Sequence, residues 1–579
     1  MKRTNLFLFF IILIATFLRF WQIGAVPASP DWDEVSLGYN AYSLMQTGRD
    51  EYGKLLPFIF RSYEDFKPPL YAYLAIPSIA VFGLTTIAVR LPAVLFGILA
   101  VLGMYLLVKE LFKPLSFRTH SSGEKSQKDS IFGGDLSFVE MTEYVALLSS
   151  LLLAISPWHI QLSRVAFESS TALTVIIFAS LFFLKGLKKP WLISLSVALF
   201  SATIYLYQSQ KVFAPVLLIA LVLLYRKELF SLPKKYIITP LLIGAIIVLP
   251  IVAYTITRQQ ALSRATSTSI FSHELNPEYN STIRLQLDKQ NNDESGYLFD
   301  NKLLAYKKEM LNGYLAHFDL NWLFIRGDME RHHAPGMGLL YLWELPFLLI
   351  GLYQLFFHEK RKKEKLLVFS WLLLAPIPAS LTVETPHAVR TLQMLPMIEI
   401  LVAVGLVTAY RVIKSSSHQV FTSKVIKLFI LLLFIFVLLF NFMYYLNQYF
   451  VQQNYFYGRS WQYGYAQTIP AVQKLAEDND KIVVSNQKYL DQSYMFFLFY
   501  TKYPPQKYQA ENKLYGITAP YKVMGKYEFR PIDWNTDGKL RKTLFVGNAD
   551  DFPASITPTM VITSPDGKAV IKVVESMRE

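Results

Sequence analysis

The sequence contains no cysteine in 579 residues. Disulfide bonds, thiolate nucleophiles and cysteine-based zinc or iron–sulfur sites are therefore excluded. Charged residues are also few, at 17%, against about 25% in a typical soluble domain. We find no convincing glycine-rich phosphate loop, so nothing in the sequence indicates a nucleotide-binding site of that kind.

Hydrophobic residues, in contrast, make up 53% of the chain and aromatic residues 15%. This composition is typical of a multi-pass membrane protein, in which aromatic side chains mark the ends of the spans. The formal net charge of +14 could indicate a nucleic-acid partner. We favour basic loops that face anionic lipid, because the basic residues lie between apolar runs.

Eleven apolar runs are plausible membrane spans, and the shorter ones must extend into flanking polar sequence to reach about 20 residues. The first begins after Lys2 and Arg3 and passes through Arg19 with no small-residue cleavage site, so we interpret it as an uncleaved span. The spans are expected near residues 5–25, 87–108, 143–157, 168–184, 191–207, 212–225, 236–256, 339–357, 366–383, 391–412 and 425–446.

Lysine and arginine alternate between rich and poor loops along these spans. The N-terminus and every second loop carry two to five of them, as in "HEKRKKEK" at 358–365, whereas the short loops between carry one each: Arg164, Lys211 and Arg390. By the positive-inside rule the N-terminus is cytoplasmic and the chain ends outside.

This topology places two long loops, 26–86 and 257–337, on the outer side. The apolar stretch 69–84 is then expected to be an interfacial or re-entrant helix broken by Pro77, since a further span would invert the charge pattern. We expect residues 1–450 to form the membrane domain and residues 451–579 an extracytoplasmic α/β domain. Its predicted elements are a helix near 466–478 and the strand-like runs "KIVVSN", "KTLFVG", "TMVITS" and "AVIKVV".

Three carboxylates lie close together in "SPDWDEVSLGY" at the start of the first outer loop. Asp31 and Glu34 have the spacing of a capping box, which gives both a structural explanation. Asp33 is not needed for the cap; its structural alternative is a surface acid that complements the helix dipole, worth about 0.3–1 kcal/mol. Asp33 is therefore the acid in this stretch that most needs a functional explanation.

A second polar element, "YEDFKPPLYAYL" (63–74), follows in the same loop. A residue before proline is held in extended backbone, which predicts that Lys67 precedes the helix that Pro68 and Pro69 begin. Its cation would lie at a helix N-terminus, where phosphate is favoured. The structural alternative is a lysine that snorkels at the membrane surface.

The order "DEVxxG" and then "DFKPPL" in one outer loop resembles the membrane-embedded GT-C glycosyltransferases, above all the protein O-mannosyltransferase and aminoarabinose-transferase (ArnT) branches. The resemblance covers most of residues 1–450. It continues through "PWHIQLSRVAFE", "TIYLYQSQKVF", "GDMERHHAPGMGLLYLWELPFLLIGL" and "TPHAVRTLQMLPMIEILVAVGL". It implies an all-α polytopic membrane fold of about eleven helices with the small outer α/β domain.

The resemblance also implies a reaction: transfer of a monosaccharide from a polyprenyl-phosphate carrier to an acceptor protein, lipid or glycan outside the cell membrane. It implies that Asp33 is the catalytic base and that Lys67 contacts the lipid phosphate. The second acid is Asp65 by the mannosyltransferase pattern. ArnT-like enzymes carry a glutamate where this chain has Phe66, which leaves Glu64 open as well as Asp65.

The residue chemistry agrees with such a transfer. A carboxylate takes the proton of an attacking hydroxyl, and cations stabilise the departing phosphate in a single inverting displacement. The full set of candidates is Asp33, Asp65 and Glu34 for catalysis, Lys67, Arg390 and Arg164 for the donor phosphate, and His387, Glu64 and Tyr63 for substrate binding. Arg390 has helix-end snorkelling as its structural alternative.

No cofactor is required by this reading. A divalent metal such as Mg or Mn on the acids of the first loop stays open, whereas His332 and His333 are adjacent, which is a poor spacing for one site.

We weigh three other functions: an oligosaccharyl or glycan-polymerising transferase of the same fold, a multi-pass transporter, and an envelope scaffold. Transport is disfavoured because the two halves of the sequence are unlike and the charged residues crowd at one face of the membrane. A scaffold would not need the acids of the first loop.

Overall fold

The computed structural model describes residues 2–63, 65–113, 138–257, 268–271, 277–359, 361–415, 424–515 and 521–576. Glu64, one of the candidate acids, therefore lies outside the described residues. The chain divides into two compact units, which we call the helical unit and the loop–sheet unit.

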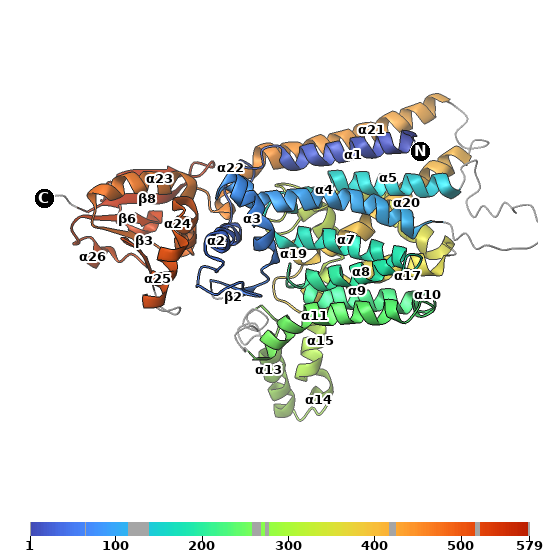
Figure 1. The fold of residues 1–579 in the computed structure, drawn as a ribbon, viewed down its shortest axis with the longest axis horizontal. Coiled ribbons are helices and arrows are strands. Elements are labelled where there is room, and N and C mark those ends of the chain that lie inside the picture. Colours follow the sequence, from blue (N-terminus) through green and yellow to red (C-terminus); the bar gives the residue numbers. More distant parts are fainter. Residues whose placement is uncertain are drawn as a thin grey trace, which may run out of the picture. The chain divides into compact units, whose positions relative to one another are not determined.

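The helical unit comprises residues 1–19, 96–161 and 169–445. Long, nearly parallel helices dominate it (Figure 1). Its elements, in whole or in large part, are α1 (Lys2–Phe20), α4 (Thr86–Leu111), α5 (Phe138–Ile155), α6 (Pro157–Leu162), α7 (Glu168–Gly186), α8 (Trp191–Thr203), α9 (Gln210–Leu224), α10 (Arg226–Phe230), α11 (Lys235–Thr257), α13 (Pro277–Gln290), α14 (Gly296–Phe299), α15 (Lys302–Ala316), η3 (Trp322–Arg326), α16 (Glu344–Tyr353), η4 (Gln354–His358), α17 (Lys362–Leu374), α18 (Ile377–Ser380), α19 (Ala388–Thr391), η5 (Leu392–Met394), α20 (Leu395–Ser415) and α21 (Lys424–Asn447).

Every predicted span coincides with a helix. Among the described residues, six helices are long and apolar enough to cross a membrane: Arg3–Phe20, Thr86–Leu111, Glu168–Gly186, Lys235–Thr257, Ala388–Ile413 and Leu428–Trp461. The other five predicted spans fall on the shorter helices α5, α8, α9, α16 and α17. The chain is therefore a polytopic membrane protein whose fold class agrees with the sequence.

Small residues let some of these helices approach closely. Helix α16 packs against α20, and a Cβ added to Gly351 would overlap the carbonyl of Leu401, while one on Gly405 would overlap that of Phe347. Apolar burial between helices is worth little in a lipid environment, so close backbone contact of this kind stabilises the pair.

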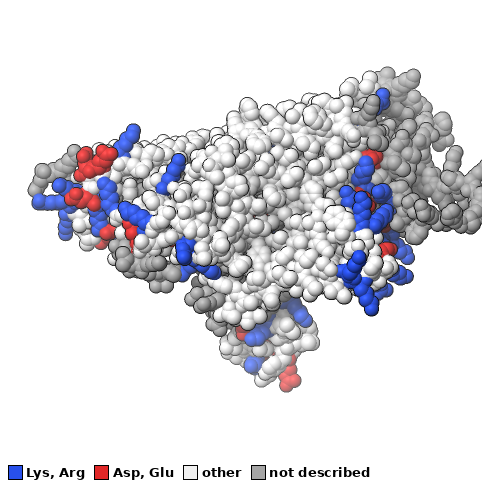
Figure 2. All heavy atoms as spheres, viewed as in Figure 1, with Lys and Arg blue, Asp and Glu red and all other residues white. Residues whose placement is uncertain are grey.

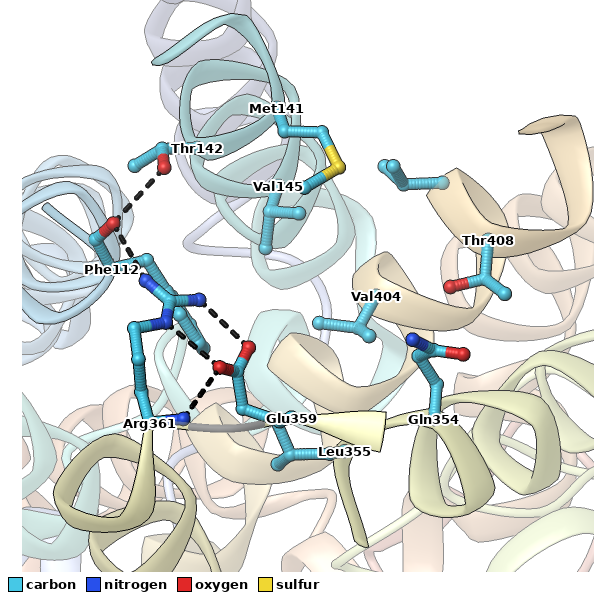
Figure 3. Close-up of a pocket in the computed structure, with 11 residues that line it drawn as sticks. Phe112, Met141, Thr142, Val145, Gln354, Leu355, Glu359, Arg361, Val404 and Thr408 are labelled. Carbon is cyan, nitrogen blue, oxygen red and sulfur yellow. Dashed lines mark hydrogen bonds and ion pairs between the residues drawn. The ribbon is translucent and has the colours of Figure 1, made fainter. Parts of the chain in front are cut away.

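Charged side chains cap one end of the helical unit. Figure 2 shows Lys and Arg side chains gathered where α10 and the start of α17 lie, beside a long face that is almost free of charge. Arg361 is paired with Glu359 at 2.8 Å and donates to the Phe112 carbonyl, which also accepts from Thr142 (Figure 3). These bonds tie together the ends of α4, α5 and α17 around a small cavity of about 40 Å³.

The loop–sheet unit comprises residues 20–95, 162–168 and 446–579. Its elements are α2 (Trp32–Thr47), β1 (Phe60–Ser62), β2 (Asp65–Lys67), α3 (Leu70–Phe82), the start of α4, η6 (Gln448–Gln452), α22 (Gln453–Tyr457), η7 (Gly458–Trp461), α23 (Tyr465–Leu475), η8 (Ala476–Asp478), β3 (Lys481–Val484), η9 (Lys488–Leu490), α24 (Ser493–Thr501), α25 (Pro505–Tyr515), β4 (Lys522–Met524), β5 (Tyr527–Phe529), α26 (Trp534–Asp537), β6 (Thr543–Gly547), η10 (Ala549–Asp551), β7 (Met560–Thr563) and β8 (Ala569–Glu575).

The C-terminal residues form a six-stranded mixed sheet in the order β4-β5-β3-β6-β8-β7. Strand β3 runs parallel to β5 and β6, and the other pairs are antiparallel. The four predicted strands and the predicted helix are confirmed as β3, β6, β7, β8 and α23, whereas β4 and β5 were not predicted. One expectation was wrong: α3 continues from Leu70 to Phe82 through Pro77 instead of breaking there.

The helices of the first loop share a hydrophobic core with the C-terminal residues. Helix α2 packs against α3, α24 and α25. Val35 and Leu37 of α2 are buried in the same cluster as Phe496 and Leu498 of α24. The first loop is therefore packed against the C-terminal region, which positions the polar residues discussed next.

Candidate active site

The first turn of α2 is fixed by the predicted capping box. The Asp31 carboxylate accepts from the Glu34 backbone N–H at 2.9 Å, and the Glu34 carboxylate accepts from the Asp31 N–H at 3.2 Å. This confirms the local role expected for both acids. Asp33 lies between them on the first turn and takes no part in the cap.

Asp33 and Lys67 form an ion pair. Residues 60–67 fold as a hairpin, with Phe60 opposite Lys67 in β1 and β2, and this hairpin carries the lysine back to the start of α2. Lys67 lies in extended backbone before Pro68, as the sequence predicted. The Lys67 side chain is 7% exposed and that of Asp33 is 32% exposed, so the carboxylate is the accessible member of the pair.

Glu34 is completely buried against Arg90. Arg90 donates from Nε and Nη2 to the two Glu34 oxygens, each at 2.9 Å, and further to the carbonyls of Ile23 and Ser29. Glu34 also accepts from the Ala166 backbone N–H at 2.9 Å. A fully bonded, buried, bidentate pair is a structural anchor. This geometry favours a structural role for Glu34 over the catalytic role we considered.

The hairpin also carries Asp65, a candidate for the second acid. The backbone of Asp65 pairs with that of Ser62 in the β1–β2 ladder. Tyr63, at the turn, adopts a positive φ of 58°, and its hydroxyl donates to the Trp32 carbonyl. Tyr63 thus ties the hairpin to the residue before Asp33, and the choice between Glu64 and Asp65 as second acid stays a prediction.

Another acid of the first loop, Glu51, was not among the residues singled out from the sequence. Its side chain is 0% exposed. Its Oε1 accepts from the Asn40 amide at 3.3 Å, while Oε2 is buried without a hydrogen bond. Burial raises the pKa of the Glu51 carboxyl to about 7, against the opposing effect of the Lys522 cation.

Lys522 and Tyr494 bring the C-terminal region to this acid. The Lys522 ammonium lies 3.8 Å from the centroid of the Tyr494 ring and 3.4 Å from the Tyr52 hydroxyl. Tyr494 in turn meets the Tyr63 ring at 6.1 Å, and the Lys67 ammonium lies 5.3 Å from that ring. A continuous row of rings and cations therefore joins Glu51 to the Asp33–Lys67 pair.

Glu51 should give the folded protein a distinctive pH dependence of stability. Because its pKa in the folded state lies above the ordinary value of 4.5, the folded state binds a proton more tightly than the unfolded state. Stability should therefore fall as the pH rises from the ordinary pKa to the raised one, by about 3 kcal/mol in total.

Glu51→Gln keeps the shape and removes the titration. The variant should melt at a higher temperature than wild type at pH 8, and the difference should shrink at pH 5. Glu511→Gln makes the same chemical change at a carboxylate that accepts from the Tyr503 hydroxyl and is the matched control. An unchanged slope in Glu51→Gln would contradict the assignment.

Arg164 is buried in the loop–sheet unit. Its side chain is 0% exposed and its guanidinium donates to the Val26 carbonyl at 3.1 Å and to the Tyr449 hydroxyl at 3.3 Å. The guanidinium also lies 4.7 Å from the Phe450 ring centroid. These contacts favour a packing role for Arg164 over contact with a donor phosphate.

Arg390 and His387 belong to the helical unit. Arg390 donates to the Thr382 hydroxyl and the Val383 carbonyl at 2.8 and 2.7 Å and approaches Glu384 at 3.5 Å. His387 is the N-cap of α19 and accepts from the Arg390 backbone N–H. Their proposed contact with substrate stays a prediction.

Comparison with known proteins identifies the fold. No family model and no curated protein matches the sequence. The chain is similar to the solved structure of ArnT from Cupriavidus metallidurans in the apo state, with a TM-score of 0.51 and 14% identity over 98% of this chain and 97% of that chain. A second structure of that ArnT, bound to undecaprenyl phosphate, gives 0.51 and 13% over 99% and 98%.

The archaeal oligosaccharyltransferase AglB from Archaeoglobus fulgidus is also similar, with a TM-score of 0.45 and 12% identity over 86% of this chain and 63% of that chain. The likeness to ArnT extends over nearly the whole length of both chains, from the membrane helices to the C-terminal sheet. The chain therefore has the GT-C fold.

Proposed function

We propose that the protein is a membrane glycosyltransferase that moves a monosaccharide from a polyprenyl-phosphate donor to an acceptor hydroxyl on the extracytoplasmic side. The observation that carries this proposal is the pairing of a partly exposed carboxylate, Asp33, with a buried lysine that precedes Pro-Pro. A base and a phosphate-binding cation are the two groups such a transfer needs.

In the proposed reaction the Asp33 carboxylate accepts the proton of the acceptor hydroxyl. The acceptor oxygen bonds to the anomeric carbon as the bond from that carbon to the phosphate oxygen breaks, which inverts the centre. The Lys67 ammonium stabilises the charge on the departing polyprenyl phosphate. Donor phosphate would displace Asp33 from Lys67 and so release the carboxylate to act as a base.

The helical unit offers room for the lipid chain. An apolar cavity of about 440 Å³ lies among α5, α16, α20 and α21, lined by side chains such as Leu152, Trp343 and Leu438. A second, of about 540 Å³, lies among α8, α9 and α11. Apolar walls of this size suit a polyprenyl tail, and the undecaprenyl phosphate bound by the similar ArnT structure supports this class of donor.

The function is tested with the purified full-length protein in lipid nanodiscs. A panel of radiolabelled polyprenyl-phosphate sugars is offered together with a cell-envelope fraction as acceptor. The expected result is release of polyprenyl phosphate and transfer of label by wild type, with little of either by Asp33→Asn. If wild type turns over every donor no faster than Asp33→Asn does, the proposal is overturned.

The proposed topology, with the N-terminus inside and the C-terminal region outside, has a direct test because the chain lacks cysteine. Single Lys→Cys changes at the exposed residues Lys188, Lys308 and Lys539 are matched in chemistry. An impermeant thiol reagent should label positions 308 and 539 in intact cells, and position 188 only after lysis. The reverse pattern would contradict the charge-based orientation.

A further inference from the structure

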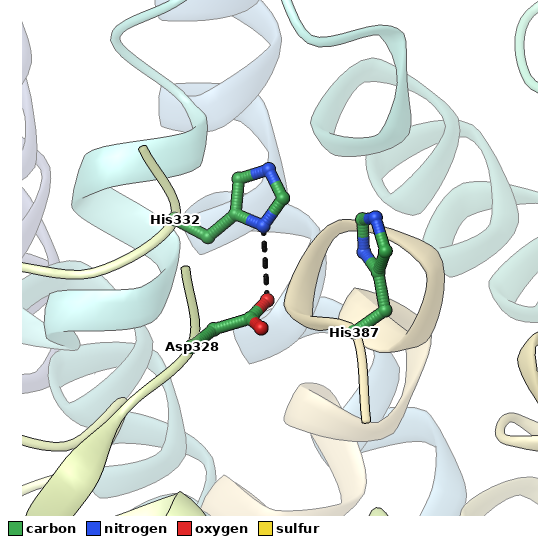
Figure 4. Close-up of side chains that lie close together, drawn as sticks. All are labelled: Asp328, His332 and His387. Carbon is green, nitrogen blue, oxygen red and sulfur yellow. Dashed lines mark hydrogen bonds and ion pairs between the residues drawn. The ribbon is translucent and has the colours of Figure 1, made fainter. Parts of the chain in front are cut away.

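Three metal-ligating side chains meet in the helical unit, and of these only His387 was considered above for substrate binding. Asp328 and His332 follow η3, and His387 precedes α19. One ligating atom from each lies within 4.8 Å of the others. Figure 4 shows Asp328 and both imidazoles turned toward a common space.

Hydrogen bonds fix the orientation of the two imidazoles. His332 Nδ1 lies 2.9 Å from Asp328 Oδ2, which also accepts from the Ala388 backbone N–H at 2.6 Å. His387 Nδ1 accepts from the Arg390 backbone N–H at 3.4 Å. His332 Nδ1 is therefore the ring nitrogen beside Asp328, and a metal ion bound by both residues would replace their hydrogen bond.

The group is also largely shielded from solvent. His332 is 4% and His387 8% exposed, and the Asp328 side chain is 6% exposed. Two imidazoles and one carboxylate are the ligand set of catalytic zinc sites, in which water takes the fourth position. Magnesium and calcium prefer a ligand set made only of oxygen atoms. The two imidazole nitrogens therefore favour a transition metal.

We propose that Asp328, His332 and His387 bind one Zn²⁺ ion. In a tetrahedral site with bonds of 2.0–2.1 Å, the ligand atoms lie about 3.3 Å apart. The separations here are up to 4.8 Å. Small side-chain rotations would shorten them to that value. The ion would join the segment after η3 to the N-terminus of α19, and so hold the backbone that carries Arg390.

The experiment uses the full-length protein in detergent after removal of metal with a chelator. Zn²⁺ is titrated by calorimetry into wild type, His332→Asn and His387→Asn. Asparagine keeps the N-cap of α19 at position 387. His333→Asn is the matched control, because His333 is a buried neighbour whose Nδ1 lies 3.2 Å from the Met329 carbonyl and which is not in the group.

Wild type and His333→Asn should bind one Zn²⁺ per chain and melt at a higher temperature with the metal. His332→Asn and His387→Asn should each lose at least about 100-fold in affinity. Absence of stoichiometric binding by wild type, or equal affinity in all four proteins, would overturn the proposal.

A measurement on wild type alone guards against misfolded variants. Zinc-edge X-ray absorption of the loaded protein should show about two imidazoles per zinc with oxygen in the remaining positions. A ligand shell without imidazole would refute this site. Neither measurement depends on sugar transfer, so failure of the metal site and failure of the proposed function can be told apart.

Discussion

Asp33→Asn should lower turnover by at least about 100-fold, because general-base assistance is typically worth about 10²–10⁴ in rate. The amide keeps the shape of the side chain and cannot accept the proton. Donor binding should be retained or strengthened, because the ion pair with Lys67 is lost and the ammonium becomes available to phosphate. Steady-state rates and donor affinity measured on the same preparation separate the two effects.

Asp31→Asn is the matched control, two residues away on the same turn. Asparagine caps a helix nearly as well as aspartate, so the hydrogen bond from the Glu34 N–H should survive and most activity with it. If Asp33→Asn transfers sugar at nearly the wild-type rate while Asp65→Asn does not, the base is Asp65 and the assignment to Asp33 is wrong.

Lys67→Met should weaken donor binding by about 10- to 100-fold, because a hydrogen bond to a charged group contributes about 1.5–3 kcal/mol. Affinity for an acceptor that carries no phosphate should change much less. Methionine fills a similar volume in this nearly buried position, and calorimetry with a polyprenyl phosphate reports the loss directly.

Two further variants locate the effect. Lys67→Arg should recover part of the affinity because it retains the charge. Lys54→Met makes the same chemical change at an exposed lysine of the same loop and should leave donor affinity unchanged. Unchanged affinity in Lys67→Met would mean that this lysine serves only to pair with Asp33.

The local features of the site were readable from the sequence because they depend on neighbours. The spacing of Asp31 and Glu34 predicted the capping box, and the proline after Lys67 predicted its extended backbone. The helical nature of every span was likewise readable, since a long apolar run can cross a bilayer only with its backbone groups bonded internally.

Other features of the site were not readable because their partners are far away in the chain. Glu34 is a candidate catalytic acid by sequence, and nothing near it in the chain predicts that Arg90, 56 residues away, donates to both of its oxygens. Glu51 carries no local signal at all. Its raised pKa comes from burial, and the lysine beside it is contributed by a strand 470 residues from Tyr52.

The sequence by itself determined the membrane character, the placement of the spans, four of the six strands of the C-terminal sheet and the turn that presents Asp33. Each of these follows from composition or from contacts within a few residues. Only the tertiary structure decided which polar groups far apart in the sequence meet. It paired Glu34 with Arg90, brought Lys522 to Glu51, and joined Asp328 to the start of α19 across 60 residues. Burial and long-range pairing set the free energy of a charged group, and neither is encoded in the residues next to it.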